Sequence, residues 1–281
     1  MPGIRDFAGK VVIVTGAANG IGREMSLAFA RRGARLALVD IDGEGLSRVR
    51  AELDAQGTDA CTWVVDVSVA AQVEDLCSDI YERMGRVDIL CNNAGVALGG
   101  DFELMTLEDI RWQVGVNLMG VIHGCCFFYP RMLEQGGGHI VNTASAAGLV
   151  PFSGLAMYSG TKHGVVGLSE TLRAEAAQHG IGVSVICPGV IATDIVKRSR
   201  IVAGSGQSTS HELAMKMDHI LQARGFTPDR VAYAAVRAVE KDIGVVRVTP
   251  ETCLMDWLHR LSRAVFGTLM KLGARAARSI F

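Results

Sequence analysis

Tyr158 and Lys162 are the side chains in this sequence whose types and spacing most directly suggest chemistry. They lie four residues apart in a stretch of helical character, so both side chains should project from one face of a helix. Tyrosine is a weak base at its ordinary pKa of about 10, but a neighbouring ammonium group favours the phenolate and lowers that pKa. The pair could therefore exchange a proton with an alcohol or a ketone. Taken alone, a tyrosine and a lysine at this spacing are more often ordinary residues of a helix surface.

A glycine-rich segment, Thr-Gly-Ala-Ala-Asn-Gly-Ile-Gly at residues 15–22, follows the first apolar run of the chain. Glycines allow a tight turn there and let backbone N–H groups at a helix N-terminus approach a pyrophosphate. The candidate nucleotide contacts are Gly16, Asn19, Gly20, Ile21 and Gly22. In a chain with 33 glycines such a spacing can also arise by chance, and an ordinary structural turn is the alternative.

Asp40 stands at the end of the second apolar run, 18 residues after Gly22. A carboxylate at that place can accept hydrogen bonds from the diol of an adenosine ribose and would repel a 2′-phosphate, so it favours NAD over NADP. Positions 40 to 43 contain no basic residue that would bind the phosphate of NADP. A solvated aspartate at a strand end is the alternative interpretation.

Apolar runs of strand length alternate with amphipathic stretches of helix length, which predicts βαβ units and a parallel sheet. We expect strands near 11–15, 35–39, 61–65, 87–91, 139–143, 183–187 and 245–248. We expect helices near 20–32, 43–56, 69–84, 107–134, 155–179 and 227–241. No repeat or low-complexity linker interrupts this pattern, so residues 1–250 should form one NAD-binding domain.

Two segments exceed what such a sheet requires. Residues 194–226 contain a cluster of glycine, serine, glutamine and threonine and then a possible helix with Leu213, Met217 and Leu221, which suggests a substrate lid. Residues 251–281 carry apolar side chains at spacings of three and four and are rich in arginine and lysine, which predicts a basic amphipathic helix. That helix could pack on a neighbouring subunit, which is the interpretation we favour, or rest on anionic lipid.

Composition argues against several classes of protein. The formal net charge of -1 gives no sign of a nucleic-acid partner. The seven histidines and seven cysteines show no metal-ligand spacing, so no metal site is expected, and unpaired cysteines in apolar runs suit a reducing compartment. We find neither a signal sequence nor an apolar run long enough to span a bilayer, and therefore expect a cytoplasmic protein, at most peripheral to a membrane.

Further polar motifs follow the expected strands. They are Asp66 after the third strand, Asn-Asn-Ala-Gly at 92–95 after the fourth, Asn117 in the long helix, Ser145 after the fifth strand and Pro-Gly-Val-Ile-Ala-Thr at 188–193 after the sixth. With the glycine loop, Tyr158 and Lys162, the chain resembles the classical short-chain dehydrogenase/reductase family over nearly all of residues 7–250. The resemblance implies a single α/β domain in which helices flank a Rossmann-like, doubly wound parallel sheet of about seven strands.

The resemblance also implies roles for four side chains. Tyr158 would be the acid/base that exchanges a proton with the substrate oxygen, and Ser145 would hydrogen-bond and orient that oxygen. Lys162 would lower the pKa of Tyr158 and hold the nicotinamide ribose. Asn117 would hold a water that relays protons from Lys162 toward solvent. Hydride transfer itself would be the chemistry of the cofactor, NAD.

Five more positions would contact NAD by the same resemblance. Asp66 and Val67 would meet the adenine, and Asn93 would meet the adenosine ribose region through its backbone. Ile191 and Thr193 would meet the carboxamide. These positions follow strands of the expected sheet, whose carboxyl ends line the ligand crevice of such folds.

The positions that would face the substrate are apolar. They are Val96, Ala97, Leu98, Val150, Phe152 and Leu155, with Ile195, Val196, Leu213 and Met217 in the lid. Such a pocket fits a lipophilic alcohol or ketone, for example a steroid, retinoid, terpenoid or fatty-acyl derivative, better than a sugar. That several of these residues are simply core is an alternative of equal weight.

The leading functional hypothesis is an NAD-dependent alcohol dehydrogenase that assembles as a homodimer or homotetramer. A 3-oxoacyl reductase of the same family would usually use NADPH, which Asp40 disfavours, and a nucleotide-sugar epimerase would need a larger C-terminal region. A non-catalytic NAD-binding sensor or scaffold is the alternative from a different class. The complete set Asn117, Ser145, Tyr158 and Lys162 argues against it, because a sensor needs no proton relay.

Overall fold

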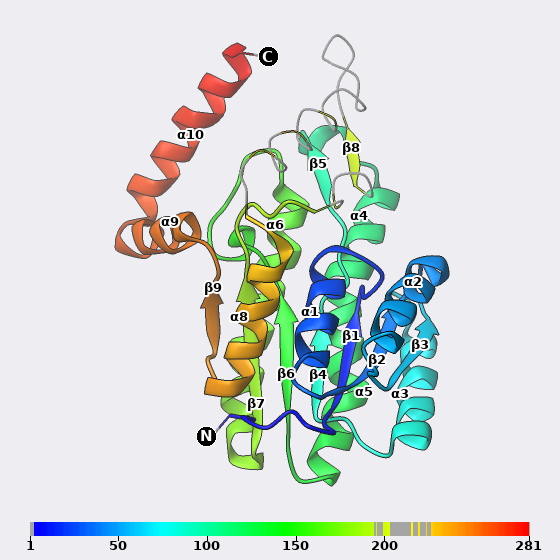
Figure 1. Cartoon of the computed structure of the whole chain (residues 1–281). Coiled ribbons are helices and arrows are strands. Elements are labelled where there is room, and N and C mark those ends of the chain that lie inside the picture. Colours follow the sequence, from blue (N-terminus) through cyan, green and yellow to red (C-terminus); the bar gives the residue numbers. More distant parts are fainter. Residues whose placement is uncertain are drawn as a thin grey trace.

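Seven parallel strands form the main sheet, in the order β3-β2-β1-β4-β6-β7-β9 (Figure 1). The computed structural model describes residues 3–193, 195, 199–202, 215, 219, 223 and 226–280, without the side chains of 273–280. The strands of this sheet are β1 (Val11–Thr15), β2 (Arg35–Asp40), β3 (Ala60–Val64), β4 (Ile89–Asn92), β6 (Gly138–Thr143), β7 (Ile181–Cys187) and β9 (Val245–Arg247). The expected doubly wound parallel sheet is confirmed, and every strand ends within two residues of its predicted position.

Helices cover both faces of the sheet (Figure 1). One face packs against α1 (Gly20–Ala30), α2 (Gly43–Asp54) and α8 (Pro228–Lys241). The other packs against α3 (Ala70–Met84), α5 (Gly120–Glu134) and α6 (Ala156–Ala176). Successive residues of a strand point to opposite faces, so a strand that is covered on both faces reads as a continuous apolar run. In β1, Val12 and Val14 enter the first core, whereas Val11 and Ile13 enter the second.

The direction in which strands are added to the sheet reverses between β1 and β4. In open α/β sheets, ligands bind outside the carboxyl ends of the strands at this switch point. The glycine loop leaves the end of β1, and the turn at 92–95 leaves the end of β4. The topology therefore brings two of the sequence motifs to one crevice.

The long helix expected at 107–134 differs from the prediction in its middle. It consists of α4 (Leu107–Val114), a π-helical turn (Gly115–Met119) and α5. A π turn is a wider coil than an α-helix and is often found at functional sites. Asn117 lies in this turn, which apolar periodicity does not reveal.

A second, two-stranded parallel sheet pairs β5 (Leu98–Gly100) with β8 (Arg200–Val202). Neither strand was predicted, because three-residue strands show almost no periodicity and two residues of β5 are glycines. β8 belongs to the expected lid at 194–226. Most of that segment, with the helix expected around Leu213, Met217 and Leu221, lies outside the described residues.

The tail is helical as expected, but it is divided into α9 (Pro250–Leu261) and α10 (Arg263–Ile280). Ser262 between them has an extended backbone with φ −156° and ψ 105°, and its hydroxyl oxygen accepts the Val265 N–H at 3.3 Å. Serine favours such capping positions, and the apolar spacing continues across the break, so periodicity alone could not reveal it. Among the helices described, none is long and apolar enough to cross a bilayer.

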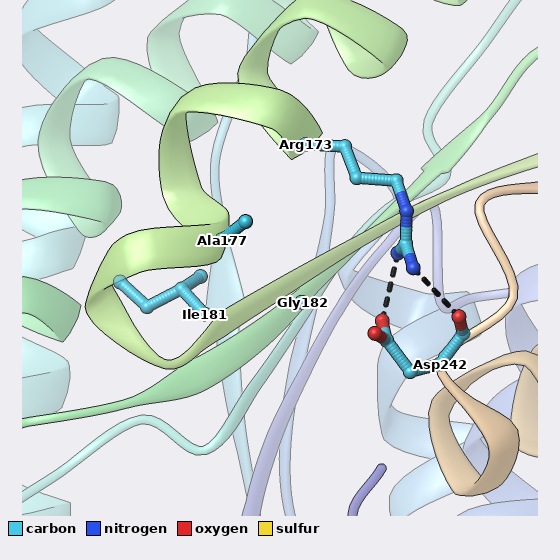
Figure 2. Close-up of a pocket in the computed structure, with 5 residues that line it drawn as sticks. All are labelled: Arg173, Ala177, Ile181, Gly182 and Asp242. Atoms are coloured by element: carbon cyan, nitrogen blue, oxygen red, sulfur yellow. Dashed lines mark hydrogen bonds and ion pairs between the residues drawn. The ribbon is translucent and has the colours of Figure 1, made fainter. Parts of the chain in front are cut away.

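At the amino end of β7, an ion pair ties α6 to the end of α8. Arg173 donates from Nη1 to the Asp242 carboxylate and from Nη2 to the Asp242 carbonyl, both at 2.7 Å (Figure 2). Asp242 ends α8 with a φ of 50°, the left-handed conformation that often terminates helices. The two bonds therefore hold this turn between α8 and β9 against α6.

His139 in β6 is buried close enough to this ion pair for the charges of both Arg173 and Asp242 to act on it, and it is 2 % exposed. Its Nε2 lies 2.8 Å from Ser184 Oγ, which donates its own hydrogen to the Ile243 carbonyl at 2.6 Å. Nε2 therefore carries a proton and donates to Ser184. Burial lowers the pKa of His139 to about 4, although the charge of Asp242 acts in the opposite direction.

We expect His139 to make the fold sensitive to acid. Between pH 6.5 and 4 the imidazole is protonated in the unfolded state but stays neutral in the folded state. The free energy of unfolding therefore falls as pH falls, by about 3 kcal/mol at pH 4. Urea unfolding of wild type and His139→Gln at pH 7.5 and 4.5 measures this, because glutamine keeps a donor near Ser184 but does not titrate. His179→Gln, at an exposed histidine, is the control. An equal loss of stability in wild type and His139→Gln would contradict the prediction.

Candidate active site

The glycine loop between β1 and α1 has the shape of a phosphate cradle. Gly16 and Gly20 have φ values of 67° and 52°, which other residues adopt only with strain. A Cβ on Gly22 would lie 2.0 Å from the Gly16 carbonyl oxygen, so only glycine lets the helix start so close to the turn. The first turn of α1 contains no acidic residue that would repel an anion. The loop therefore fits a pyrophosphate at the N-terminus of α1.

Asp40 ends β2 beside this loop and is 7 % exposed. One carboxylate oxygen accepts the Ala18 N–H and the other accepts the Asp42 N–H, both at 3.0 Å. Each carboxylate oxygen can accept a second hydrogen bond, so the group is held in place without being saturated. A buried aspartate fixed by backbone donors differs from the solvated strand-end residue that was the alternative.

The turn after β4 is fixed by Thr15, a residue that sequence reasoning missed. Its hydroxyl oxygen accepts the backbone N–H groups of Asn93 and Ala94 at 2.9 and 3.0 Å. The Asn93 side-chain amide donates to the Thr15 carbonyl at 3.0 Å, so both the backbone N–H and the side chain of Asn93 bond to Thr15 and stabilise the turn. Asn92 donates to Asn142 in β6 at 2.9 Å and so braces the sheet.

Tyr158 and Lys162 lie one turn apart on α6, as their spacing predicts. Lys162 is 3 % exposed, and its Nζ lies 5.8 Å from the centre of the Tyr158 ring. Nζ donates to the Thr143 carbonyl at the end of β6 at 2.9 Å, a partner that residue types could not reveal. Burial lowers the pKa of Lys162 to about 8, so below that pH the ammonium form prevails.

The protein surroundings raise the pKa of Tyr158, opposite to the lowering expected from Lys162. Burial is the largest cause, and a hydrogen bond from the Ser145 side chain acts against it. Ser145 follows β6, and its hydroxyl oxygen also accepts the Ala147 N–H at 3.2 Å. The hydroxyl groups of Ser145 and Tyr158 are thus neighbours.

Asn117 reaches the same place from the π turn and is fully buried. Its side chain pairs with both backbone groups of Val96, accepting the N–H and donating to the carbonyl, each at 2.8 Å. A Cβ on Gly95 would lie 3.4 Å from Asn117 Oδ1 and 3.6 Å from Lys162 Nζ. Asn117 and Lys162 therefore meet at Gly95, which leaves room for both.

The remaining expected cofactor residues surround the crevice in different ways. Asp66 accepts the N–H and hydroxyl of Ser68 at 2.9 and 2.7 Å, whereas the Val67 side chain is 8 % exposed and packs in the core. Ile191 is buried. The Thr193 methyl group would lie 3.5 Å from a Cβ on Gly20, so Thr193 stands across from the glycine loop.

The expected substrate-facing residues divide into two groups. Leu98 and Val150 are 0 % and 1 % exposed and belong to the packed interior. Val96, Ala97, Phe152 and Leu155 are partly exposed, and Phe152 also packs against the second core. Among the lid residues, Ile195 is described, whereas Val196, Leu213 and Met217 lie outside the described residues.

Arg200 anchors the described start of the lid segment. Its N–H donates to the Ala97 carbonyl at 3.0 Å, and its guanidinium lies 4.4 Å from the centre of the Trp112 ring. The same guanidinium donates to Asp109 at 2.9 Å. Cation–π and ionic contacts thus join β8 to α4, a connection that the sequence alone did not indicate.

This sheet order, with a glycine loop at its switch point, defines a nucleotide-binding α/β protein. The family model for short chain dehydrogenases matches residues 10–202. The chain belongs to the short chain dehydrogenase family.

Two relatives show what the chain is similar to. It is 38% identical over 257 residues to the probable oxidoreductase EphD of Mycobacterium tuberculosis, a match that covers 91% of this chain and 43% of EphD. The chain thus spans less than half the length of that relative. It is 36% identical over 204 residues to 1-deoxy-11-beta-hydroxypentalenate dehydrogenase of Streptomyces exfoliatus, covering 72% of this chain and 74% of that one.

Solved structures of the family hold either nicotinamide cofactor. A short chain dehydrogenase/reductase from Burkholderia phymatum in complex with NAD has a TM-score of 0.86 at 32% identity, covering 93% of this chain and 96% of that one. A metagenomic short-chain oxidoreductase in complex with NADP has a TM-score of 0.70 at 29% identity, and the match covers 87% of this chain and 99% of that one. The family therefore binds a nicotinamide cofactor, either NAD or NADP.

Proposed function

We propose that this protein is an NAD-dependent dehydrogenase that interconverts a secondary alcohol and a ketone on a lipophilic substrate, with Tyr158 as the acid/base. The observation that carries the proposal is the convergence of Ser145, Tyr158, Lys162 and Asn117 beside the glycine loop. Four residues from three separate segments meet where the sheet opens, which a binding scaffold would not require.

The protein residues would manage the proton, while the bound cofactor would supply or accept the hydride. In the reducing direction, the protonated Tyr158 donates to the ketone oxygen, and in the oxidising direction its phenolate removes the alcohol proton. Ser145, next to that hydroxyl group, holds the substrate oxygen in line. The Lys162 ammonium would favour the phenolate and would hold the nicotinamide ribose. Asn117, which meets Lys162 at Gly95, would hold a water that relays protons to solvent.

Asp40 supports NAD as the cofactor. Its carboxylate is fixed beside the glycine loop by two backbone donors and can still accept hydrogen bonds from a ribose diol. A 2′-phosphate at the same place would bring like charges together. Asp66, Val67, Asn93, Ile191 and Thr193 would complete the cofactor site around the crevice.

The partly exposed apolar residues beside the site support a lipophilic substrate. We further propose a cytoplasmic homodimer or homotetramer in which residues 194–226 act as the substrate lid. Formation of reduced cofactor from a panel of lipophilic secondary alcohols and matched sugar alcohols, with NAD and NADP in parallel, tests the function. Turnover of lipophilic alcohols with NAD is expected, and a preference for sugar alcohols or for NADP would contradict the corresponding part of the proposal.

A further inference from the structure

The tail helices α9 and α10 each present a row of exposed apolar side chains. On α9 it consists of Leu254, Trp257 and Leu261, which are 57%, 60% and 70% exposed. On α10 it consists of Val265, Leu269 and Leu272, which are 61%, 54% and 55% exposed. The spacings of three and four residues put these side chains on one side of each helix, and the spacing of four in the sequence continues from Leu261 to Val265. We call these six residues the apolar row.

Attachment of the tail to the body uses other side chains. Phe266 is 5 % exposed and packs with its neighbour His259, with ring centres 5.2 Å apart. Met255, Leu258 and Met270 pack against the second core, to which Phe266 itself belongs. The apolar row is thus not needed to hold the tail in place, and its exposure to water is unfavourable unless another surface covers it.

The charge of α10 indicates what that surface is. Its sequence contains Arg263, Lys271, Arg275 and Arg278 but no aspartate or glutamate, in a chain whose net charge is -1. On α9, Asp256 already pairs with Arg247 and Arg260. Pairing of α10 with α10 of a second copy would bring like charges together, whereas an anionic lipid surface would attract them.

The position of α10 fits the same partner. It extends beyond the carboxyl ends of the strands, at the end of the molecule that carries β5 and β8 (Figure 1). An amphipathic helix with basic and apolar sides lies in the plane of a bilayer surface, with its apolar side among the lipid chains. The crevice at the sheet ends would then lie on the side of the molecule that is nearer the lipid.

We propose that α9 and α10 dock the protein on an anionic phospholipid bilayer through the apolar row together with Arg263 and Lys271. The substitution that tests this is the double variant Leu261→Ser/Leu269→Ser. Both side chains are more than half exposed, so the fold should remain, and equal melting temperatures would verify it. Leu107→Ser is the matched control, because Leu107 is 67% exposed on α4.

Flotation of the full chain with vesicles measures binding. Wild type and Leu107→Ser should float with vesicles of phosphatidylcholine and phosphatidylglycerol, and much less with phosphatidylcholine alone or at 0.5 M salt. The double variant should lose about tenfold in partition coefficient for each leucine. Flotation of the double variant equal to wild type would overturn the proposal. A second outcome would also overturn it: wild type does not float, and light scattering shows that it forms a larger particle than the double variant. In that case a second copy of the chain would cover the apolar row.

Discussion

Tyr158→Phe should lower kcat by about 10²- to 10⁴-fold while the dissociation constant for NAD stays within about twofold of wild type. The substitution removes one oxygen atom and keeps the ring, so the contacts of α6 should persist. What disappears is the hydroxyl group beside Ser145 that exchanges a proton with the substrate. Steady-state kinetics and calorimetric titration with NAD measure the two quantities separately.

Tyr81→Phe is a closely matched control for this experiment. Tyr81 is also partly buried, burial raises its pKa to about 12, and Arg131 lies 4.4 Å from its ring centre. It lies on α3, away from the crevice, and hydrogen-bonds only to Gln135 at 3.3 Å among the contacts described. Turnover should therefore be unchanged in Tyr81→Phe. Wild-type turnover in Tyr158→Phe would refute the acid/base role.

Asp40→Ala should reduce the preference for NAD over NADP, measured as the ratio of the two kcat/KM values, by roughly 10- to 100-fold. The substitution removes the carboxylate that accepts hydrogen bonds from the ribose diol and repels a 2′-phosphate. It also leaves the Ala18 N–H without its partner, so activity with both cofactors should fall. The ratio isolates the recognition of the ribose from this loss of loop structure.

Asp88→Ala supplies the control for a buried carboxylate. Asp88 is 3 % exposed and accepts the Val11 N–H at 3.0 Å, but at the amino end of β1, opposite the crevice. Its removal should lower stability and leave the ratio of kcat/KM values as in wild type. A ratio that changes equally in both variants would show that Asp40 acts through stability alone.

The main sheet could be predicted closely because its strands are buried on both faces. Continuous apolar runs such as Val11 to Val14 are hard to mistake when glycine and polar turns bound them. The π turn at Gly115–Met119 and the pairing of β5 with β8 could not be predicted in this way. Both take part in contacts between distant segments, which leave no periodic signal: Asn117 with Val96 in the one case and Arg200 with Trp112 in the other.

The candidate active site was likewise predictable in some features and not in others. The spacing of Tyr158 and Lys162 placed both on one helix face, and the motif order placed Ser145 and Asn117 with them. In the protein without cofactor, burial raises the pKa of Tyr158, which the spacing of residues could not show because burial depends on how completely the surrounding segments close around the ring. The backbone carbonyl that holds Lys162 has no sequence signature at all.

Transfer of deuterium from the carbinol carbon of labelled secondary alcohols to the nicotinamide ring tests the proposed function most directly. Lipophilic alcohols carrying the label would be incubated with the protein and equal amounts of NAD and NADP, and both cofactors analysed by mass spectrometry. We predict label in reduced NAD, much less in reduced NADP, and at most about one hundredth of the wild-type rate with Tyr158→Phe. Label mainly in reduced NADP, or transfer by Tyr158→Phe at the wild-type rate, would contradict the proposal.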